Sequence, residues 1–389
     1  MRVCMLAYTH YEFDGRVTRY AEALVQRGDH VDVLVVGYKG QIRKEVIRGV
    51  NVYRIQRRTT DETVPLSYLL KIVVFLANSA FRTALMHLRR KYDVIHVHSI
   101  PDFEVFAALI PKLFGAKCIL DIHDIVPEFY AEKFNVSEDA LVYRSLLAVE
   151  RLSTRFADHV IAANDIWAER LLSRSVPAKK CTVFLNYPDQ TIFNRKTKLF
   201  ENPEFVMIYP GTLSAHQGLD LAIRAMTIIK NEAPEAQLHI YGHGGLRESL
   251  MELTSELGLD HNVKFHEILP LEKIALVMAS ADLGIVPKRA DSFGNEAFST
   301  KILEFMSLGV PVLAADTAID KYYFNDSQIC FFESGNEEEL ARSVLYLINN
   351  PDVRESIARN GEDRAADFSW EKHKQRYFDL VDSLVDGSS

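Results

Sequence analysis

The segment from residue 282 to residue 313 restricts the fold more than any other, because its pattern is a strand, a polar loop, a short helix and a second strand. Residues 283–286 form a short apolar run closed by a proline, as expected of a buried strand. Ser299 and Thr300 stand where a helix N-cap belongs, and Gly309 is placed to end that helix. The segment therefore predicts one strand–helix–strand unit of an α/β sheet.

The start of this helix has the chemistry of an anion site. A helix N-terminus carries free N–H groups and a partial positive charge, which favour a phosphate. Lys301 lies in the first turn, and Glu304 lies three residues further on the same face. One helix end can thus offer a cation to a diphosphate and a carboxylate to a ribose diol.

The same segment resembles glycosyltransferase family 4, whose members are retaining enzymes that use nucleotide sugars. The family carries two glutamates separated by seven residues, then a short helix and Gly-x-Pro-Val, matched here by Glu296, Glu304, Gly309 and residues 311–312. The resemblance implies two Rossmann-like domains facing across a cleft (the GT-B fold). It also implies Glu304 on the ribose hydroxyls and Glu296 near the donor sugar. Ser299 and Thr300, at the helix start, are expected to bind the nucleotide sugar. Without it, the segment is an ordinary strand–helix unit with a charged surface loop.

Length and charge agree with two soluble domains. A chain of 389 residues is too long for one ordinary domain, and 48% hydrophobic with 25% charged residues is a globular composition. The net charge of −8 argues against nucleic acid as the main partner. Four scattered cysteines show no disulfide or metal spacing, which favours a reducing cytoplasm.

The N-terminal segment predicts the opening of a doubly wound sheet. Residues 2–8 form a strand, not a signal peptide, and a helix from 16 to 27 and a strand from 30 to 36 follow. The loop between the first strand and helix has one glycine, fewer than the family usually has there. Asp14 and Arg16 at its end either contact the acceptor or cap the helix.

Basic residues are concentrated in two places in the N-terminal half: residues 39–58, and Arg82 with residues 89–91. One hypothesis is a face that sits on an anionic membrane and holds a lipid-linked acceptor there. The alternative is a solvated surface plus one amphipathic core helix. The most apolar long segment, residues 64–88, is interrupted by polar and charged residues, so we expect no transmembrane helix.

Polar residues end the next two strands, at 93–98 and 117–122. His96 and His98 alternate onto one face, but no third ligand stands near them in the sequence, so we expect no metal. Asp121-Ile-His-Asp ends the second strand, where an open α/β sheet faces its ligand crevice. The resemblance implies His123 against the donor sugar and Asp124 on the acceptor side.

The C-terminal half departs from the family where the diphosphate should be neutralised. After a strand at 205–209, Gly211 is followed by Thr212 and Gln217, at places where the family typically has Arg and Lys. The charge of a leaving diphosphate must still be balanced in the transition state. We therefore predict that Lys301 and Arg289 supply the positive charge, with Lys288 as the next candidate on the same loop.

Two further matches carry the resemblance. A strand at 237–241 leads into a glycine-rich turn, where Gly242, Gly244 and Arg247 match the family and imply donor contacts alongside Gly211 and Thr212. Residues 368–370 begin the last helix, which in the family crosses back onto the N-terminal domain. We expect domains at 1–190 and 205–367, a linker at 191–204, and this helix at 368–389.

The predicted function is transfer of a hexose, with retention, from a nucleotide diphosphate sugar to a glycan or lipid-linked acceptor. Cell-surface polysaccharide or glycolipid synthesis is the expected setting, in the cytoplasm or at the inner face of the membrane. We expect neither metal nor other cofactor, since side-chain cations can neutralise a diphosphate. The alternatives are a non-catalytic nucleotide-sugar-binding subunit and a nucleotide-sugar epimerase or phosphorylase of the same fold.

Overall fold

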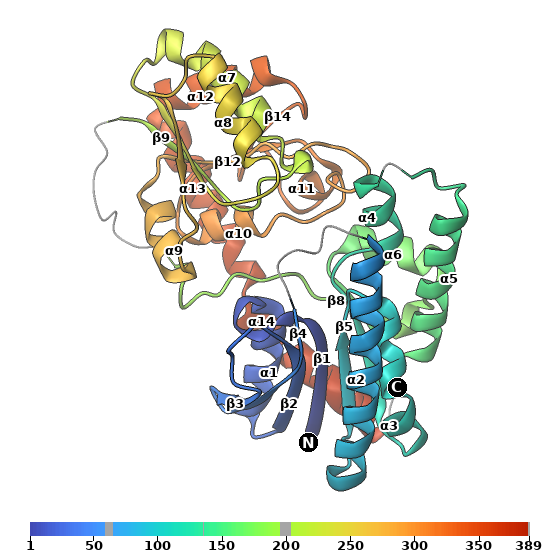
Figure 1. Cartoon of the computed structure of the whole chain (residues 1–389). Helices are drawn as coiled ribbons and strands as arrows, with labels where there is room; N and C mark the ends of the chain where they lie inside the picture. Colours follow the sequence, from blue (N-terminus) through green and yellow to red (C-terminus); the bar gives the residue numbers. More distant parts are fainter. Residues whose placement is uncertain (59–64, 135, 195–203, 388–389) are drawn as a thin grey trace. The chain divides into compact units, whose positions relative to one another are not determined.

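A computed structural model describes residues 1–58, 65–134, 136–194 and 204–387. The chain divides into two compact units (Figure 1). Unit 1 comprises residues 1–186 and 373–389, and unit 2 comprises residues 187–372. Most of the linker expected at 191–204, namely residues 195–203, lies outside the described residues.

Unit 1 is built on a parallel sheet with one antiparallel edge strand. Its described strands run in the order β3-β4-β2-β1-β5-β6-β7-β8, and β3 alone pairs antiparallel among them. The strands are β1 (Arg2–His10), β2 (His30–Gly37), β3 (Lys44–Ile47), β4 (Val50–Arg57), β5 (Val94–His98), β6 (Lys117–Ile122), β7 (His159–Ala162) and β8 (Cys181–Val183). β1, β2 and β5 are mostly apolar and buried along most of their length, which explains why these strands lie inside the sheet.

The helices of unit 1 connect these strands. They are η1 (Tyr11–Phe13), α1 (Gly15–Arg27), α2 (Pro65–Arg90), η2 (Asp102–Ala108), α3 (Leu109–Leu113), α4 (Val126–Lys133), α5 (Leu141–Phe156), α6 (Asp165–Arg174), η3 (Ala178–Lys180) and most of α14 (Trp370–Asp386). Arg27 of α1 donates to Asp382 of α14 at 2.8 Å, and the rings of Tyr20 of α1 and Tyr377 of α14 lie 4.4 Å apart. The final helix therefore packs on α1 and, through the Tyr377 hydroxyl near His96, on β5.

Two local features of unit 1 were not predicted from the sequence. The basic segment 39–58 contains a β-hairpin, β3–β4, and its Arg54 is buried in ion pairs with Glu12 and Glu45 instead of facing solvent. The segment after β5 is a 3-10 helix followed by α3, and not one continuous helix, because Pro111 lacks the N–H that a continuous helix would need there.

Unit 2 has an entirely parallel sheet in its described residues, ordered β11-β10-β9-β12-β13-β14. The strands are β9 (Val206–Pro210), β10 (Gln237–Tyr241), β11 (Val263–His266), β12 (Leu283–Val286), β13 (Val312–Ala315) and β14 (Cys330–Phe332). The helices are η4 (Ala215–Gln217), α7 (Leu219–Glu232), α8 (Arg247–Glu256), α9 (Leu271–Ser280), α10 (Thr300–Ser307), α11 (Ala318–Tyr323), α12 (Glu337–Asn349), α13 (Pro351–Ala365) and η5 (Ala366–Phe368).

One apolar cluster holds unit 2 together. It joins the inner residues of β9, β10 and β12 to the buried faces of α7 and α12, including Met207, Leu238, Ile285, Ile229 and Val344. The loops after the carboxyl ends of β9, β10 and β12 lead into the segments that carry the predicted donor residues.

Candidate functional site

The start of α10 lies where the sequence predicts it. Ser299 is the N-cap in an extended conformation, and Gly309 follows the helix with a positive φ of 70°. The Ser299 side chain does not cap the helix. Its Oγ is buried and makes no hydrogen bond within the described part of the chain, so a polar atom stays available beside the first turn.

Lys301, in the first turn of α10, is partly buried between the loop after β9 and the strand itself. Its Nζ donates to Gln217 Oε1 at 3.2 Å and lies 5.2 Å from the centre of the Tyr209 ring. A Cβ on Gly211 would come within 2.6 Å of Lys301 Cε, so the glycine makes room for the lysine stem. Burial lowers the pKa of Lys301 to about 8, although nearby Glu304 acts in the opposite direction.

Gln217 links Lys301 to the departure from the family pattern. Its Oε1 accepts hydrogen bonds from Lys301 and also from the Tyr209 hydroxyl, the latter at 2.9 Å. The amide that stands at the family's lysine position is thus in contact with the lysine of α10. The sequence contains both residues, but their separation of 84 positions hides this contact.

Glu304 is the second polar group of this helix turn. Burial raises the pKa of its carboxyl to about 7, while Lys301 and a hydrogen bond with Thr300 act to lower it. A carboxyl and an ammonium that are both poorly solvated gain most from a ligand that brings hydroxyl groups to one and negative charge to the other. The arrangement suits a ribose next to a diphosphate.

The glycine-rich turn after β10 packs against the loop after β9. A Cβ on Gly242 would lie 1.8 Å from the Gly211 carbonyl oxygen, and one on Gly244 would lie 2.3 Å from the Leu213 carbonyl oxygen. Arg247 stabilises the turn by donating to the Gly242 carbonyl at 2.8 Å and to the His266 carbonyl at 3.0 Å. These residues therefore shape the loop that holds exposed Thr212.

The two cations on the loop before α10 already have acidic partners. Arg289 pairs with Asp220 of α7 at 2.5 Å. Lys288 is buried, pairs with Asp320 at 3.0 Å and donates to the Ala297 carbonyl at 2.7 Å, so it ties the loop to α11. Glu296 is half-buried on the same loop. Lys301 differs from these two cations, because its contacts in the described part of the chain are with an amide oxygen and an aromatic ring and not with a carboxylate.

In unit 1 the predicted residues gather around Asp121, which is fully buried at the end of β6. Arg16 makes a two-pronged ion pair with it, at 2.8 Å to Oδ2 and 2.6 Å to Oδ1. His123 Nε2 lies 3.3 Å from Asp121 Oδ2. Burial alone would raise the pKa of Asp121, but Arg16 and His123 hold it well below its usual range. Asp121 thereby fixes the orientation of His123.

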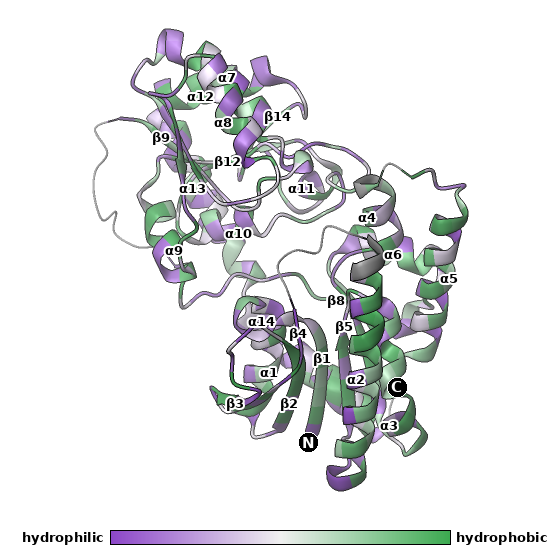
Figure 2. Cartoon of the chain, in the orientation of Figure 1, coloured by the Kyte–Doolittle hydropathy of each residue, from purple (hydrophilic) through white to green (hydrophobic). Residues whose placement is uncertain are grey.

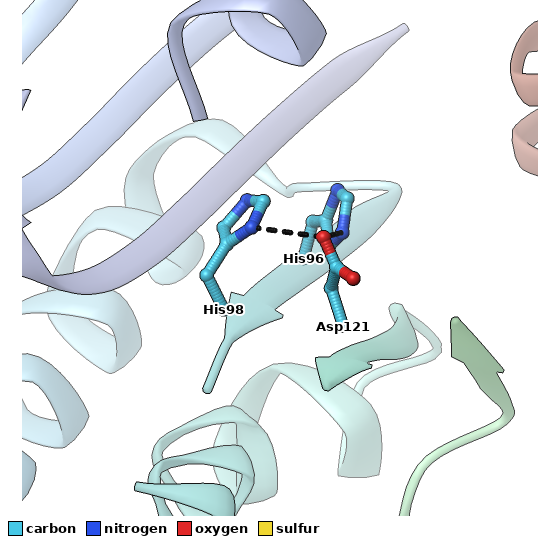
Figure 3. Close-up of side chains that lie close together, drawn as sticks. All are labelled: His96, His98 and Asp121. Atoms are coloured by element: carbon cyan, nitrogen blue, oxygen red, sulfur yellow. Dashed lines mark ion pairs between the residues drawn. The ribbon is translucent and has the colours of Figure 1, made fainter. Parts of the chain in front are cut away.

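The expectation that no third ligand lies near His96 and His98 was wrong. Asp121, on the neighbouring strand, completes a buried group whose ligand atoms all lie within 4.8 Å of one another (Figure 3). Both carboxylate oxygens are engaged by the Arg16 guanidinium, whose positive charge opposes a metal ion at this place. His96 Nδ1 is in addition within 2.9 Å of the Tyr377 hydroxyl. The donor set therefore fits an ion-pair network better than a metal centre.

The other two residues assigned to the acceptor side differ in their contacts. Asp14 caps α1, since its Oδ1 accepts from the backbone N–H of Arg16 at 3.1 Å and of Val17 at 3.0 Å. This is the capping role that the sequence left open. Asp124 is partly buried beside His123, and burial raises its pKa.

Comparison with protein families gives matches over most of the chain. The model described as "Glycosyl transferase 4-like domain" matches residues 15–186. The model described as "Glycosyl transferases group 1" matches residues 190–364. The two matches fall on the two halves that the sequence pattern separates.

Known proteins agree with these matches. An uncharacterized glycosyltransferase of Methanocaldococcus jannaschii is 28% identical over 371 residues, which cover 90% of this chain and 89% of the relative. A GDP-mannose-dependent monoacylated alpha-(1-6)-phosphatidylinositol monomannoside mannosyltransferase of Corynebacterium glutamicum is 25% identical over 254 residues, or 64% of each chain.

Solved structures establish the fold. Sucrose-phosphate synthase from Thermosynechococcus elongatus superposes with a TM-score of 0.82 at 19% identity and covers 99% of both chains. Anabaena HepE in complex with UDP-glucose superposes with a TM-score of 0.75 at 19% identity, over 98% of this chain and 100% of HepE. The expected fold class of two Rossmann-like domains is confirmed. The chain belongs to the family-4-type glycosyltransferases of GT-B fold.

Proposed function

We propose that the chain transfers a hexose from a nucleotide diphosphate sugar, with retention, to a glycan or a lipid-linked acceptor. The names of two relatives support a nucleotide sugar: HepE is described with UDP-glucose, and the Corynebacterium enzyme uses GDP-mannose. The latter also acts on a phosphatidylinositol mannoside, which supports a lipid-linked acceptor. We place this activity in the cytoplasm, in cell-surface polysaccharide or glycolipid synthesis.

The observation that carries the proposal is the pair of poorly solvated groups on the first turn of α10. In the proposed site, Lys301 balances the diphosphate charge and Glu304 accepts from the ribose hydroxyls. The backbone at Ser299 and Thr300 provides the helix N-terminus for the phosphate. Arg289 is the second proposed cation, and it would have to exchange Asp220 for the diphosphate.

The proposed chemistry needs no protein nucleophile. The leaving diphosphate accepts the proton of the acceptor hydroxyl on the face where the new bond forms, and this keeps the anomeric configuration. Glu296 orients the sugar and steadies its developing positive charge, and His123 contacts the donor sugar. Side-chain cations take the place of a metal in this proposal.

The specific observation behind the second candidate function is the amide at Gln217. The chain lacks the family's usual cation there, so a subunit that binds a nucleotide sugar without turnover is the alternative. The third candidate function is that of an epimerase or a phosphorylase. An epimerase would release nucleotide without an acceptor, and a phosphorylase would release it in response to phosphate.

A thermal-shift panel of nucleoside diphosphates and their sugars tests the donor site. Wild type should be stabilised by one nucleotide family, by about 2.7 kcal/mol at a hundredfold excess over Kd. Glu304→Ala and Lys301→Ala should lose that shift, because each removes one half of the proposed contact. Glu338→Ala, in the first turn of α12, is the matched control and should keep it.

Turnover then separates the alternatives. In the proposed enzyme, nucleotide release requires an acceptor, and the product keeps the donor's anomeric configuration. Lys301→Ala should cost about 3–4 kcal/mol of transition-state stabilisation, which lowers kcat/KM by a factor of about 10²–10³. Tight binding without release under any acceptor would identify a binding subunit. Near-normal kcat/KM in Lys301→Ala would remove the role of this lysine, and no shift with any nucleotide would remove the donor site.

A further inference from the structure

The polarity of α2 is inverted relative to an ordinary surface helix. The side that packs on the protein carries Ser79, Thr83 and His87, all buried, together with Ile72 and Phe75. The Ser79 hydroxyl lies within hydrogen-bond distance of the Phe75 carbonyl, at 2.8 Å, and of the buried Glu104 carboxyl of η2, and the His87 ring accepts from the Tyr92 N–H at 3.1 Å. Polar groups on this side are thus matched by partners in the fold.

The opposite side of α2 is apolar and faces away from the protein. Its large hydrophobic side chains are between 40% and 71% exposed, and Figure 2 shows the helix as hydrophobic along most of its length. They are Leu69, Leu70, Val73, Val74, Phe81, Leu85 and Leu88. A continuous apolar stripe of this kind in a soluble protein marks an interaction surface.

The apolar surface extends onto α3. Leu109, Leu113 and Phe114 are exposed there, and the Phe114 ring lies 6.4 Å from the His87 ring of α2. The two helices therefore present one surface, called here the α2–α3 face. It is defined by the exposed hydrophobic residues of α2 together with Leu109, Leu113 and Phe114.

The charges on this face are of one sign. Between Pro65 and Arg90 the sequence holds four basic residues and no Asp or Glu, in a chain whose net charge is −8. Arg82 and Arg89 are exposed on α2. A helix with an exposed apolar face and Lys or Arg as its sole charged residues is complementary to anionic lipid, where acyl chains meet phosphate head groups.

We propose that the α2–α3 face docks on the surface of an anionic lipid bilayer, with α2 parallel to the membrane plane. This docking does not depend on the proposed reaction. Lipid head groups would meet Arg82 and Arg89, while Phe81, Leu85 and Leu88 enter the interface between head groups and acyl chains.

Two other roles for α2 fit the contacts less well. By length and composition alone, residues 68–90 of α2 could span a membrane, and 22% of their most apolar 18-residue segment is buried inside the protein. If α2 spanned a membrane, the contacts of Ser79 and His87 with the rest of unit 1 would be lost, and buried Glu104 would lose its contact with Ser79. A symmetric pairing of two copies would bring the basic side chains of both faces together without acidic partners.

Vesicle co-sedimentation of the full chain tests the docking. Wild type should sediment with phosphatidylcholine vesicles that contain phosphatidylglycerol, should stay in solution with phosphatidylcholine alone, and should be released by raised salt. Phe81→Ser with Leu88→Ser, and separately Arg82→Glu with Arg89→Glu, should each lower the partition coefficient by about tenfold or more.

The matched control is Ile42→Ser with Val46→Ser, which removes two exposed apolar side chains from the segment around β3 and should leave binding unchanged. Unchanged thermal unfolding of each variant verifies the fold. Binding retained by both α2 variants, or none by wild type, overturns the proposal. So does a wild-type dimer without lipid that Phe81→Ser with Leu88→Ser converts to monomer, since it identifies the face as a contact between copies.

Discussion

Lys301 and Glu304 lie one helical turn apart, and burial moves their pKa values toward each other. The carboxyl pKa rises to about 7 and the ammonium pKa falls to about 8. Both groups are charged together in the free protein only within this narrow pH range. Burial thus makes the proposed donor contact sensitive to pH near neutrality, where ordinary Glu and Lys side chains do not titrate.

This residue pair predicts a bell-shaped pH dependence of kcat/KM for the donor. The value should rise toward pH 7 as Glu304 loses its proton, and it should fall above pH 8 as Lys301 becomes neutral and can no longer balance the diphosphate. Initial rates from pH 5.5 to 9.5 measure both limbs. In Lys301→Arg the alkaline limb should move up by more than one pH unit, because a guanidinium keeps its charge. An alkaline limb unmoved in Lys301→Arg would contradict the assignment.

How much of the site the sequence could predict is clearest at Asp121. The sequence marked Asp121, His123 and Asp124 by their place at a strand end, and it marked Arg16 by its place at a helix start. It gave no sign that Arg16 and Asp121 pair, because 105 residues separate them. Strand order brings them together, and strand order is a property of the whole sheet that local pattern does not contain.

At the scale of elements, prediction succeeded where one periodicity governed a segment. Helix α1, predicted at residues 16–27, runs from Gly15 to Arg27, because its apolar residues repeat with the helical period. The β3–β4 hairpin was missed because the segment is rich in basic residues, and its charge was interpreted as a membrane-facing or solvated surface. Arg54 is buried there only because Glu12 and Glu45 neutralise it, and both contacts are tertiary.

Helices α4, α5 and α6 are joined by one buried ion cluster, which gives a prediction for stability. Arg174 pairs with Glu128 and with Glu150, each at 2.5 Å, and both glutamates are buried. Arg174→Met would leave two carboxylates without this partner, which should cost about 3–5 kcal/mol. Hydrogen–deuterium exchange of α5 and α6 peptides measures the loss within unit 1.

The sign of the pH effect distinguishes this cause from lost packing. Burial raises the pKa of Glu128, but Arg174 outweighs it and holds that pKa below its usual value, so the pair stabilises the fold above that range. The loss of stability caused by Arg174→Met should therefore become smaller as the pH falls and the two carboxyl groups become protonated. Arg151→Ala, at an exposed position of α5, is the control and should change little. An equal loss of stability at pH 4 and pH 7.5 would refute the ion-pair explanation.

At the scale of the whole molecule, unit 1 is made from both ends of the chain. Tyr377 of α14 is fully buried, stacks near Tyr20 and lies within 2.9 Å of His96 Nδ1 through its hydroxyl. Tyr377→Ala should destabilise unit 1 by about 3–5 kcal/mol, since it opens a large cavity. Exchange protection should fall in β1 and β5 but not in β9 and β10. Tyr377→Phe should show a smaller loss, and equal losses in both sheets would contradict the division into units.

The return of α14 to the N-terminal sheet has a consequence for synthesis. The ribosome completes residues 1–186 long before it makes residue 373, so the nascent sheet presents the surface around Tyr20, His96 and Phe184 without its helix. At about 5–20 residues per second, the remaining 203 residues of the 389-residue chain take roughly 10–40 s to emerge. Unit 2, continuous in the chain, is finished first and folds while unit 1 waits for its last helix.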